Sequence, residues 1–337
     1  EIQNSYIPAN KLYQQCIQNP FVVISIPILK AENINILLGK KTSKEDRDCG
    51  TIIRKIDELN KKRGWTGVPI SIAKKIFIDY EKNKEKLIKE YNVFEEFDLV
   101  YNSYPREVEK YVAKIINTLI DETVKLRKKL SRESESSFSE VDDSFSTSDN
   151  EIEDQVPVEP EDLAFIKFNK NITDEQFKAV CGSLISYISV VTGPAGSGKS
   201  SIIKEIVENL KVMNEEYITA SFTGKAVTRI QEILGEKKSY TIDRLISVGG
   251  SEKIKFKTLI IDEASMVTTE LMFRLFKKFN RIFRLILVGD RDQLPPIGWG
   301  SFFEAMFDSE KIPIYKLTKI FRVEKLKEFG DNKAGIL

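Results

Sequence analysis

The eight-residue stretch GPAGSGKS, residues 193–200, decides the fold of this chain. It follows the apolar run SYISVVT (186–192), which predicts a strand, and it precedes an amphipathic stretch near 199–211, which predicts a helix. The spacing fits G-x-x-x-x-G-K-[ST], in which glycines let successive backbone N–H groups turn toward one anion. The helix N-terminus adds its positive end. The stretch therefore predicts a phosphate-binding loop.

Two side chains of this loop have expected roles in holding a nucleoside triphosphate. Lys199 would reach the β- and γ-phosphates, and Ser200 would ligate magnesium. The predicted cofactors are therefore ATP and Mg²⁺. The residues expected around the nucleotide are consecutive in the loop: Gly193, Pro194, Ala195, Gly196, Ser197, Gly198, Lys199, Ser200 and Ser201.

Beyond the loop, short apolar runs alternate with amphipathic segments. Further strands are predicted at 216–222, 257–263, 283–289 and 312–318, and further helices near 224–234, 268–279 and 301–307. Strands that are almost continuously apolar and separated by helices indicate a parallel sheet covered on both faces. The predicted fold class is α/β.

An acidic pair ends one of these predicted strands, in LIIDEAS (259–265). The apolar run places Asp262 at the carboxyl edge of the sheet, where open α/β sheets bind ligands. Asp262 can hold magnesium through water. Glu263 is placed to orient and deprotonate an attacking water molecule. A strand ending in two acids is a weak signal alone, but it becomes strong about sixty residues after a phosphate loop.

Composition excludes several kinds of chemistry. The chain has 337 residues and contains no histidine, which excludes Ser-His-Asp catalysis and the usual zinc spacings. Its three cysteines are widely spaced and indicate neither a disulfide framework nor a metal cluster. No apolar run is long enough to predict a membrane span. We expect an intracellular protein of the nucleus or cytoplasm, with a viral source left open.

The net charge of +1 hides a segregation of charge along the chain. Residues 131–162 hold twelve acidic residues and one basic residue, while residues 1–130 and 163–337 each carry a net charge of +6. The serine-rich acidic segment predicts a disordered linker. We therefore predict a mostly helical domain at 1–130, the linker at 131–162 and the α/β domain at 163–337. Two basic domains are compatible with a polyanionic ligand.

Six motifs in one order resemble the RecD/TraA branch of superfamily 1 helicases. They are TDEQFKAV (173–180), ASFTGKAVTRIQE (220–232), TIDRLI (241–246), IIDEASMV (260–267), LILVGDRDQLPPIGWGSFF (285–303) and LTKIFR (317–322). The resemblance implies a RecA-like P-loop NTPase sheet flanked by helices. It also implies an ATP-dependent DNA helicase that moves 5′ to 3′ on single-stranded DNA or at a single/double-strand junction. No membrane partner is expected.

The same resemblance assigns further site residues. It implies that Gln176 reads the adenine base, that Gln293 senses the γ-phosphate and that Arg322 contacts it. An arginine fork there would stabilise the charge on the transferring phosphoryl group, so Lys199, Glu263, Gln293 and Arg322 form the predicted catalytic set. The residues expected to contact the DNA backbone are Thr223, Gly224, Lys225 and Thr241.

Two departures from the family pattern change these expectations. Asp243 stands where the family usually has histidine, and its carboxylate would repel a DNA phosphate unless it is paired, with Arg244 as the candidate partner. The chain given also stops fifteen residues after Arg322. We therefore expect the second motor lobe on a missing segment or a separate chain, and weak hydrolysis without it.

The N-terminal region resembles, more distantly, the accessory region of the longer RecD-type helicases, which contains helical hairpins. The segments concerned are NPFVV (19–23), ILLGKKTSKEDRDCG (36–50) and RGWTGVP (63–69). Residues 39–50 and 60–69 are predicted turns, and the run from Pro105 to Leu130 is a predicted helix.

Two other functions remain open at this point. One is a DNA-binding module that uses nucleotide as a switch and has no motor activity. The other is a P-loop kinase or related transferase, which has no use for the motifs TGKA and GDRDQLPP.

Overall fold

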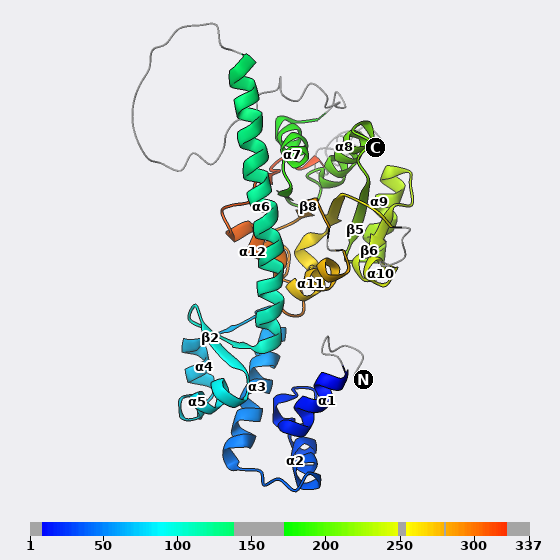
Figure 1. Ribbon diagram of the computed structural model, residues 1–337. Helices are drawn as coiled ribbons and strands as arrows, with labels where there is room; N and C mark the ends of the chain where they lie inside the picture. Colours follow the sequence, from blue (N-terminus) through cyan, green and yellow to red (C-terminus); the bar gives the residue numbers. More distant parts are fainter. Residues whose placement is uncertain (1–8, 138–171, 249–253, 280, 322–337) are drawn as a thin grey trace, which may run out of the picture. The chain divides into compact units, whose positions relative to one another are not determined.

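The computed structural model describes residues 9–137, 172–248, 254–279 and 281–321 (Figure 1). The chain divides into two compact units. Unit 1 contains residues 1–111 with the short segments 268–270 and 296–300, and unit 2 contains residues 112–267, 271–295 and 301–337. Over the described residues, each helix is too short or too polar to cross a bilayer.

A six-stranded parallel sheet forms the centre of unit 2 and confirms the predicted α/β class. Its strands are β4 (Ile188–Thr192), β5 (Tyr217–Ser221), β6 (Ser239–Thr241), β7 (Thr258–Asp262), β8 (Arg284–Gly289) and β9 (Ile314–Lys316). The spatial order is β6-β5-β7-β8-β4-β9, and each neighbouring pair is parallel. Strand β6 was not predicted because its three residues, Ser-Tyr-Thr, lack the apolar run that marks the others.

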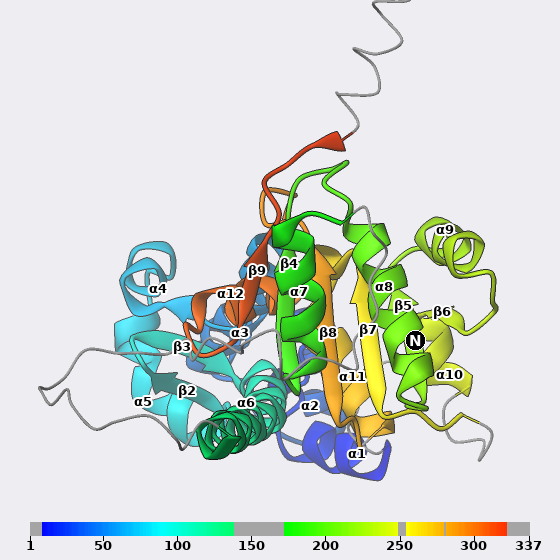
Figure 2. The same ribbon diagram turned by 90° about the horizontal axis from the view of Figure 1, so that it is seen from above.

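Helices cover the sheet on both faces. They are α7 (Asp174–Leu184), α8 (Lys199–Val212), α9 (Gly224–Leu234), α10 (Ile242–Val248), α11 (Thr269–Lys278) and α12 (Phe302–Asp308). Val191, Ile260 and Ile286 pack with apolar residues of α7 and α8 in one buried cluster, and Figure 2 shows these two helices in front of the sheet. Because both faces are covered, β4, β5, β7 and β8 are buried throughout.

The second half of the long helix α6 (Ser103–Ser137) belongs to unit 2 and supports the start of β4. The Thr123 hydroxyl accepts hydrogen bonds from the backbone N–H groups of Tyr187 and Ile188, at 2.9 and 3.3 Å. The helix runs past the predicted domain limit at residue 130 and covers the first residues of the predicted linker. Residues 138–162 lie outside the described ranges, so the linker itself stays a prediction.

Unit 1 is mainly helical, as predicted, and also contains a small antiparallel sheet that was not. Its helices are α1 (Ala9–Gln18), α2 (Ile28–Leu37), α3 (Lys44–Arg63), α4 (Ile70–Ile76) and α5 (Tyr80–Glu90), with a 3₁₀ turn at Pro20–Val22. The strands β1 (Val68–Pro69), β2 (Val93–Glu96) and β3 (Leu99–Asn102) pair in the order β1-β3-β2. The β2–β3 turn uses Phe97 and Asp98, both with positive φ, in place of the usual Asn-Gly signal.

The predicted turn at 39–50 is wrong in its second half, because α3 begins at Lys44. A capping box starts this helix. The Ser43 hydroxyl accepts from the Asp46 N–H at 3.1 Å, and the Asp46 carboxylate accepts from the Ser43 N–H at 3.0 Å. The turn predicted at 60–69 is confirmed at residues 64–67, where Gly64 has φ of 68°, but it is wrong at both ends, because α3 continues to Arg63 and β1 begins at Val68.

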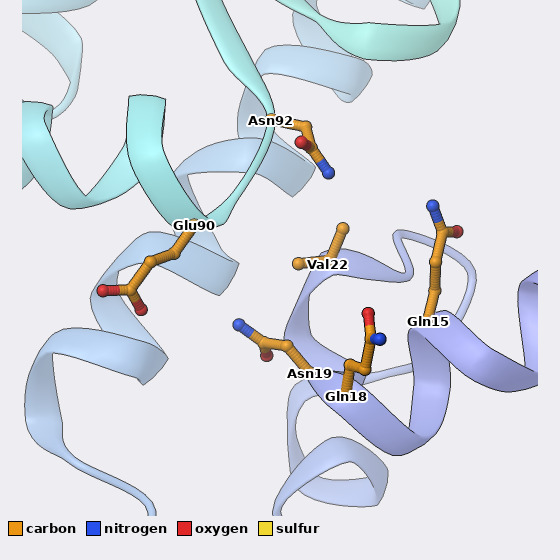
Figure 3. A pocket seen from close by; sticks show the side chains of 6 residues that line it. All are labelled: Gln15, Gln18, Asn19, Val22, Glu90 and Asn92. Atoms are coloured by element: carbon orange, nitrogen blue, oxygen red, sulfur yellow. The ribbon is translucent and has the colours of Figure 1, made fainter.

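Unit 1 also carries an open pocket with a volume of about 360 Å³ (Figure 3). Its lining is mostly amide side chains: Gln15, Gln18, Asn19, Val22, Glu90 and Asn92. None of the predicted site residues lines it, so it has no part in the site described next.

Candidate nucleotide-binding site

Strand order brings the predicted motifs to one edge of the sheet. Strand β8 lies between β4 and β7, with Thr192 opposite Gly289 and Ile261 opposite Leu287. The loops that follow these three parallel strands therefore leave the sheet side by side at its carboxyl edge (Figure 2). The phosphate loop, the acidic pair and the segment with Gln293 meet at this edge.

The phosphate loop has the shape that its glycines predict. Gly198 has φ of 91° and precedes α8, a helix of 14 residues. A Cβ atom on Gly193 would lie 2.7 Å from the Leu317 carbonyl oxygen and 2.8 Å from Ser197 Oγ. Only glycine fits at that close approach.

A buried hydroxyl in the loop suits a phosphate oxygen. Ser197 is 1% exposed, and its Oγ has no hydrogen-bond partner among the described residues. Buried polar atoms are almost always paired, so an unpaired one in a phosphate loop fits an anionic ligand. This observation supports the predicted nucleotide.

Lys199 lies among carboxylates at the foot of the loop. Its ammonium donates to the carbonyl oxygens of Gly193 and Pro194, the latter at 3.0 Å. Burial lowers the pKa of Lys199, while the charges of Asp290 and Asp262 act in the opposite direction. These acids keep a cation in a partly desolvated place, where it can face phosphate groups.

Asp262 and Ser200 provide the donor set expected for magnesium. Asp262 is buried at the end of β7, and burial raises the pKa of its carboxyl group despite a hydrogen bond from the Glu263 backbone N–H. Ser200 is half-buried in the first turn of α8. A hard divalent cation prefers such oxygen ligands and would offset the cost of burying the carboxylate.

Glu263 has a constrained backbone and an engaged side chain. Its φ and ψ are 53° and 38°, the left-handed region that is rare for residues other than glycine. The Thr223 hydroxyl donates to Glu263 Oε2 at 3.2 Å. The predicted base is thus hydrogen-bonded to a predicted DNA contact forty residues earlier in the chain.

Gln293 lies beside the acidic segment. Its backbone N–H donates to the Asp290 carbonyl oxygen at 3.3 Å, and its side-chain Oε1 accepts from the Ser265 hydroxyl at 3.3 Å. The amide Nε2 remains as the donor for a phosphate oxygen. Arg322 lies outside the described residues, but the preceding Phe321 N–H donates to the Gly196 carbonyl oxygen at 3.0 Å.

Gln176 lies against the phosphate loop. It is 5% exposed, its Oε1 accepts from the Thr173 N–H at 3.1 Å, and its Nε2 donates to the Ser197 carbonyl oxygen at 3.4 Å. These bonds make it a support of the loop. Its predicted reading of adenine stays a prediction.

The predicted DNA contacts follow neighbouring strands at the same edge. Thr223, Gly224 and Lys225 begin α9 directly after β5, and Gly224 and Lys225 are exposed. Thr241 ends β6, and its hydroxyl accepts from the Arg244 N–H at 3.2 Å.

The pairing expected for Asp243 is corrected by the structure. Its carboxylate lies 3.3 Å from Arg274 Nη1 on α11, and the sequence neighbour Arg244 is not the partner. Consecutive residues on a helix point in different directions, whereas α11 presents its guanidinium to α10 across space.

Two polar residues were missed by the sequence-based assignment. Asp290 follows the apolar strand β8 just as Asp262 ends β7, and that parallel was a usable signal. Ser265 contacts Gln293 only because the two loops meet, so its role has no local signal.

Known proteins match the C-terminal half of the chain. A family model described as an AAA domain matches residues 171–332. An uncharacterized protein of Methanocaldococcus jannaschii, MJ1519, is 35% identical over an alignment of 183 residues that covers 46% of this chain and 16% of that protein. The ATP-dependent RecD2 DNA helicase of Deinococcus radiodurans is 32% identical over an alignment of 163 residues that covers 46% of this chain and 22% of that enzyme.

Among solved structures, the Pif1 helicase from Candida albicans matches with a TM-score of 0.36 and 24% identity, over 48% of this chain and 42% of that one. The chain spans less than a quarter of the length of each of the two curated relatives, MJ1519 and the RecD2 helicase. Over the matched segment, the resemblance to RecD-like superfamily 1 helicases is confirmed.

Proposed function

We propose that this chain carries the nucleotide-hydrolysing lobe of an ATP-dependent DNA helicase. One observation carries the proposal: Lys199, Asp262 and Glu263 lie at one sheet edge together with Gln293, from three loops separated in sequence. The orphaned Ser197 hydroxyl supports a phosphate ligand at that edge.

Each side chain has a task in hydrolysis of ATP to ADP and phosphate. Lys199 offsets phosphate charge, and Ser200 and Asp262 would hold magnesium, which supplies charge neutralisation and orientation. Glu263 accepts a proton from the attacking water molecule. Gln293, oriented by Ser265, donates from Nε2 to a phosphate oxygen and loses this partner on hydrolysis, which gives a nucleotide-dependent switch. By resemblance, Arg322 adds a second cation and Gln176 contacts the base.

The same proposal places single-stranded DNA across the ends of β5 and β6. Thr223, Gly224, Lys225 and Thr241 lie there, and exposed Lys225 offers a positive charge to a phosphate. Movement 5′ to 3′, a junction substrate and a second lobe elsewhere belong to the proposal through the resemblance.

A DNA-stimulated ATPase assay on the whole chain tests the proposal. We expect single-stranded DNA to raise the hydrolysis rate, and Lys199→Ala to lower it by about 100-fold or more. Lys204→Ala is the matched control, since Lys204 lies on α8 in a surface pair with Glu208. The Lys204→Ala variant should hydrolyse ATP like the wild type.

The alternative function is a nucleotide-switched DNA-binding module. It is favoured if ATP binds and changes DNA affinity while hydrolysis stays at the level of Lys199→Ala. The hydrogen bond between Thr223 and Glu263 is the observation that gives this alternative a physical basis.

A further inference from the structure

The Thr223 hydroxyl joins the predicted DNA segment to the predicted base. It donates to Glu263 Oε2 at 3.2 Å and accepts from the Ala226 N–H at 3.2 Å, which caps α9. Thr223 is half-buried, and the next two residues are exposed. The side chain of Thr223 is therefore in part open to solvent, next to the segment at which DNA is expected.

A threonine hydroxyl has one proton to give. The phosphate oxygens of DNA and the oxygens of an ionised carboxylate both accept hydrogen bonds and carry no proton to donate. Thr223 can therefore donate to Glu263 or to a phosphate, but not to both. Because a phosphate oxygen cannot donate to the Thr223 oxygen, a DNA phosphate at this hydroxyl must accept the hydrogen bond that Thr223 otherwise donates to Glu263.

Losing this donor changes where the Glu263 carboxylate can point. The hydrogen bond directs Oε2 toward Thr223, so Thr223 orients the carboxylate for as long as the bond is present. The backbone of Glu263 is held between β7 and the 3₁₀ turn Ala264–Met266, so its carboxylate can move only by side-chain rotation.

We propose that Thr223 is a positioning residue that restrains Glu263 until a DNA phosphate accepts the hydrogen bond that the Thr223 hydroxyl donates to Glu263. Binding of DNA then frees the carboxylate to accept a proton from water, and hydrolysis becomes DNA-dependent. This inference rests on the proposed function and adds to it the contact by which DNA reaches the nucleotide site.

A binding experiment tests the competition without hydrolysis. Affinity of the whole chain for a fluorescent single-stranded oligonucleotide is measured at fixed salt for Glu263→Gln, Thr223→Val and the double variant. Because Glu263→Gln weakens the competing bond, we expect about two- to tenfold tighter binding. Glu232→Gln, at an exposed site on α9, corrects for the loss of one negative charge.

The double variant decides this experiment. In the Thr223→Val background the extra tightening from Glu263→Gln should vanish, since no hydroxyl remains to be released. The same gain in both backgrounds would overturn the inference. Absence of DNA binding by the wild type would overturn both the inference and the proposed function.

Hydrolysis rates give a second readout. We expect Thr223→Val to raise the rate without DNA and to lose DNA stimulation, while Thr223→Ser, which keeps the proton, behaves as wild type. Thr228→Val is the matched control, since Thr228 is exposed on α9 and its hydroxyl donates to the Gly224 carbonyl oxygen at 3.2 Å. A proportional loss of both rates in Thr223→Val would overturn the inference. If the wild type binds DNA but does not hydrolyse ATP, the proposed function is contradicted and the inference is not. The DNA-binding measurements on the single and double variants then still decide whether Glu263 and a DNA phosphate compete for the Thr223 hydroxyl.

Discussion

At the scale of single residues, the buried Ser197 hydroxyl separates stability from function. An unpaired buried hydroxyl costs free energy, so Ser197→Ala should leave the free energy of unfolding unchanged or raise it by about 1 kcal/mol. The same change should weaken ATP binding several-fold, because a donor to the phosphate is lost. Denaturant unfolding and calorimetric titration with a non-hydrolysable ATP analogue measure the two effects.

Ser247→Ala, on the exposed face of α10, provides the comparison and should alter neither quantity. If Ser197→Ala binds the analogue as tightly as wild type, the hydroxyl does not face the nucleotide.

Asp243 is the residue at which local and tertiary interpretations differ. Because Arg274 lies 3.3 Å away, the carboxylate is already compensated, and Asp243→His should change affinity for single-stranded DNA by less than about threefold. Lys225→Ala, which removes an exposed cation from the predicted DNA segment, should weaken binding in the same titration. Tightening of tenfold or more in Asp243→His would show that the carboxylate repels DNA despite its partner.

At the scale of elements, the start of α3 makes unit 1 sensitive to acid. Burial alone would raise the pKa of Asp46, but hydrogen bonds from Lys86, Ser43 and Tyr91 outweigh it and lower the pKa from 3.8 to about 2. A lowered pKa means that this carboxylate stabilises the fold above pH 4 and that the contribution is lost as pH falls from about 4 to 2.

We expect Asp46→Asn to remove about 1 kcal/mol of stability at neutral pH, because solvent screens part of the interaction of this partly exposed carboxylate, and to flatten the acid dependence between pH 4 and 2. Unfolding by denaturant across that range measures both. Glu85→Gln, in an exposed pair with Lys89, should keep the wild-type pH profile. Parallel profiles for wild type and Asp46→Asn would contradict the assignment.

The elements that were predicted are those whose signal is local. Strands β4, β5, β7 and β8 are continuous apolar runs, and the helices between them have apolar faces. Strand β6 and the β1-β3-β2 sheet are two to four residues long, so no periodicity can accumulate in them. They are strands because neighbouring strands supply their hydrogen bonds.

At the scale of the whole molecule, the segregation of charge along the chain predicts where a protease cleaves first. The segment 131–162 carries a net charge of −11 between two regions of +6, and beyond residue 137, where α6 ends, its composition predicts too little apolar burial to offset chain entropy. Limited digestion with a glutamate-specific protease should cleave first within 140–161 and release two fragments. Mass spectrometry identifies the sites, and first cuts inside the helices of unit 1 or unit 2 would contradict the predicted linker.

The sequence by itself determined the chemistry of each motif: a phosphate loop at 193–200, an acidic pair at 262–263 and an amide at Gln293. Such signals are local, since glycine spacing and apolar periodicity encode the backbone within a few residues. Only the tertiary structure decided which motifs touch. The placement of β8 between β4 and β7 brings Ser265 to Gln293, and the adjacency of β5 and β7 brings Thr223 to Glu263. Strand order depends on how the crossover helices connect the parallel strands, and the resulting packing joins residues that no local pattern relates.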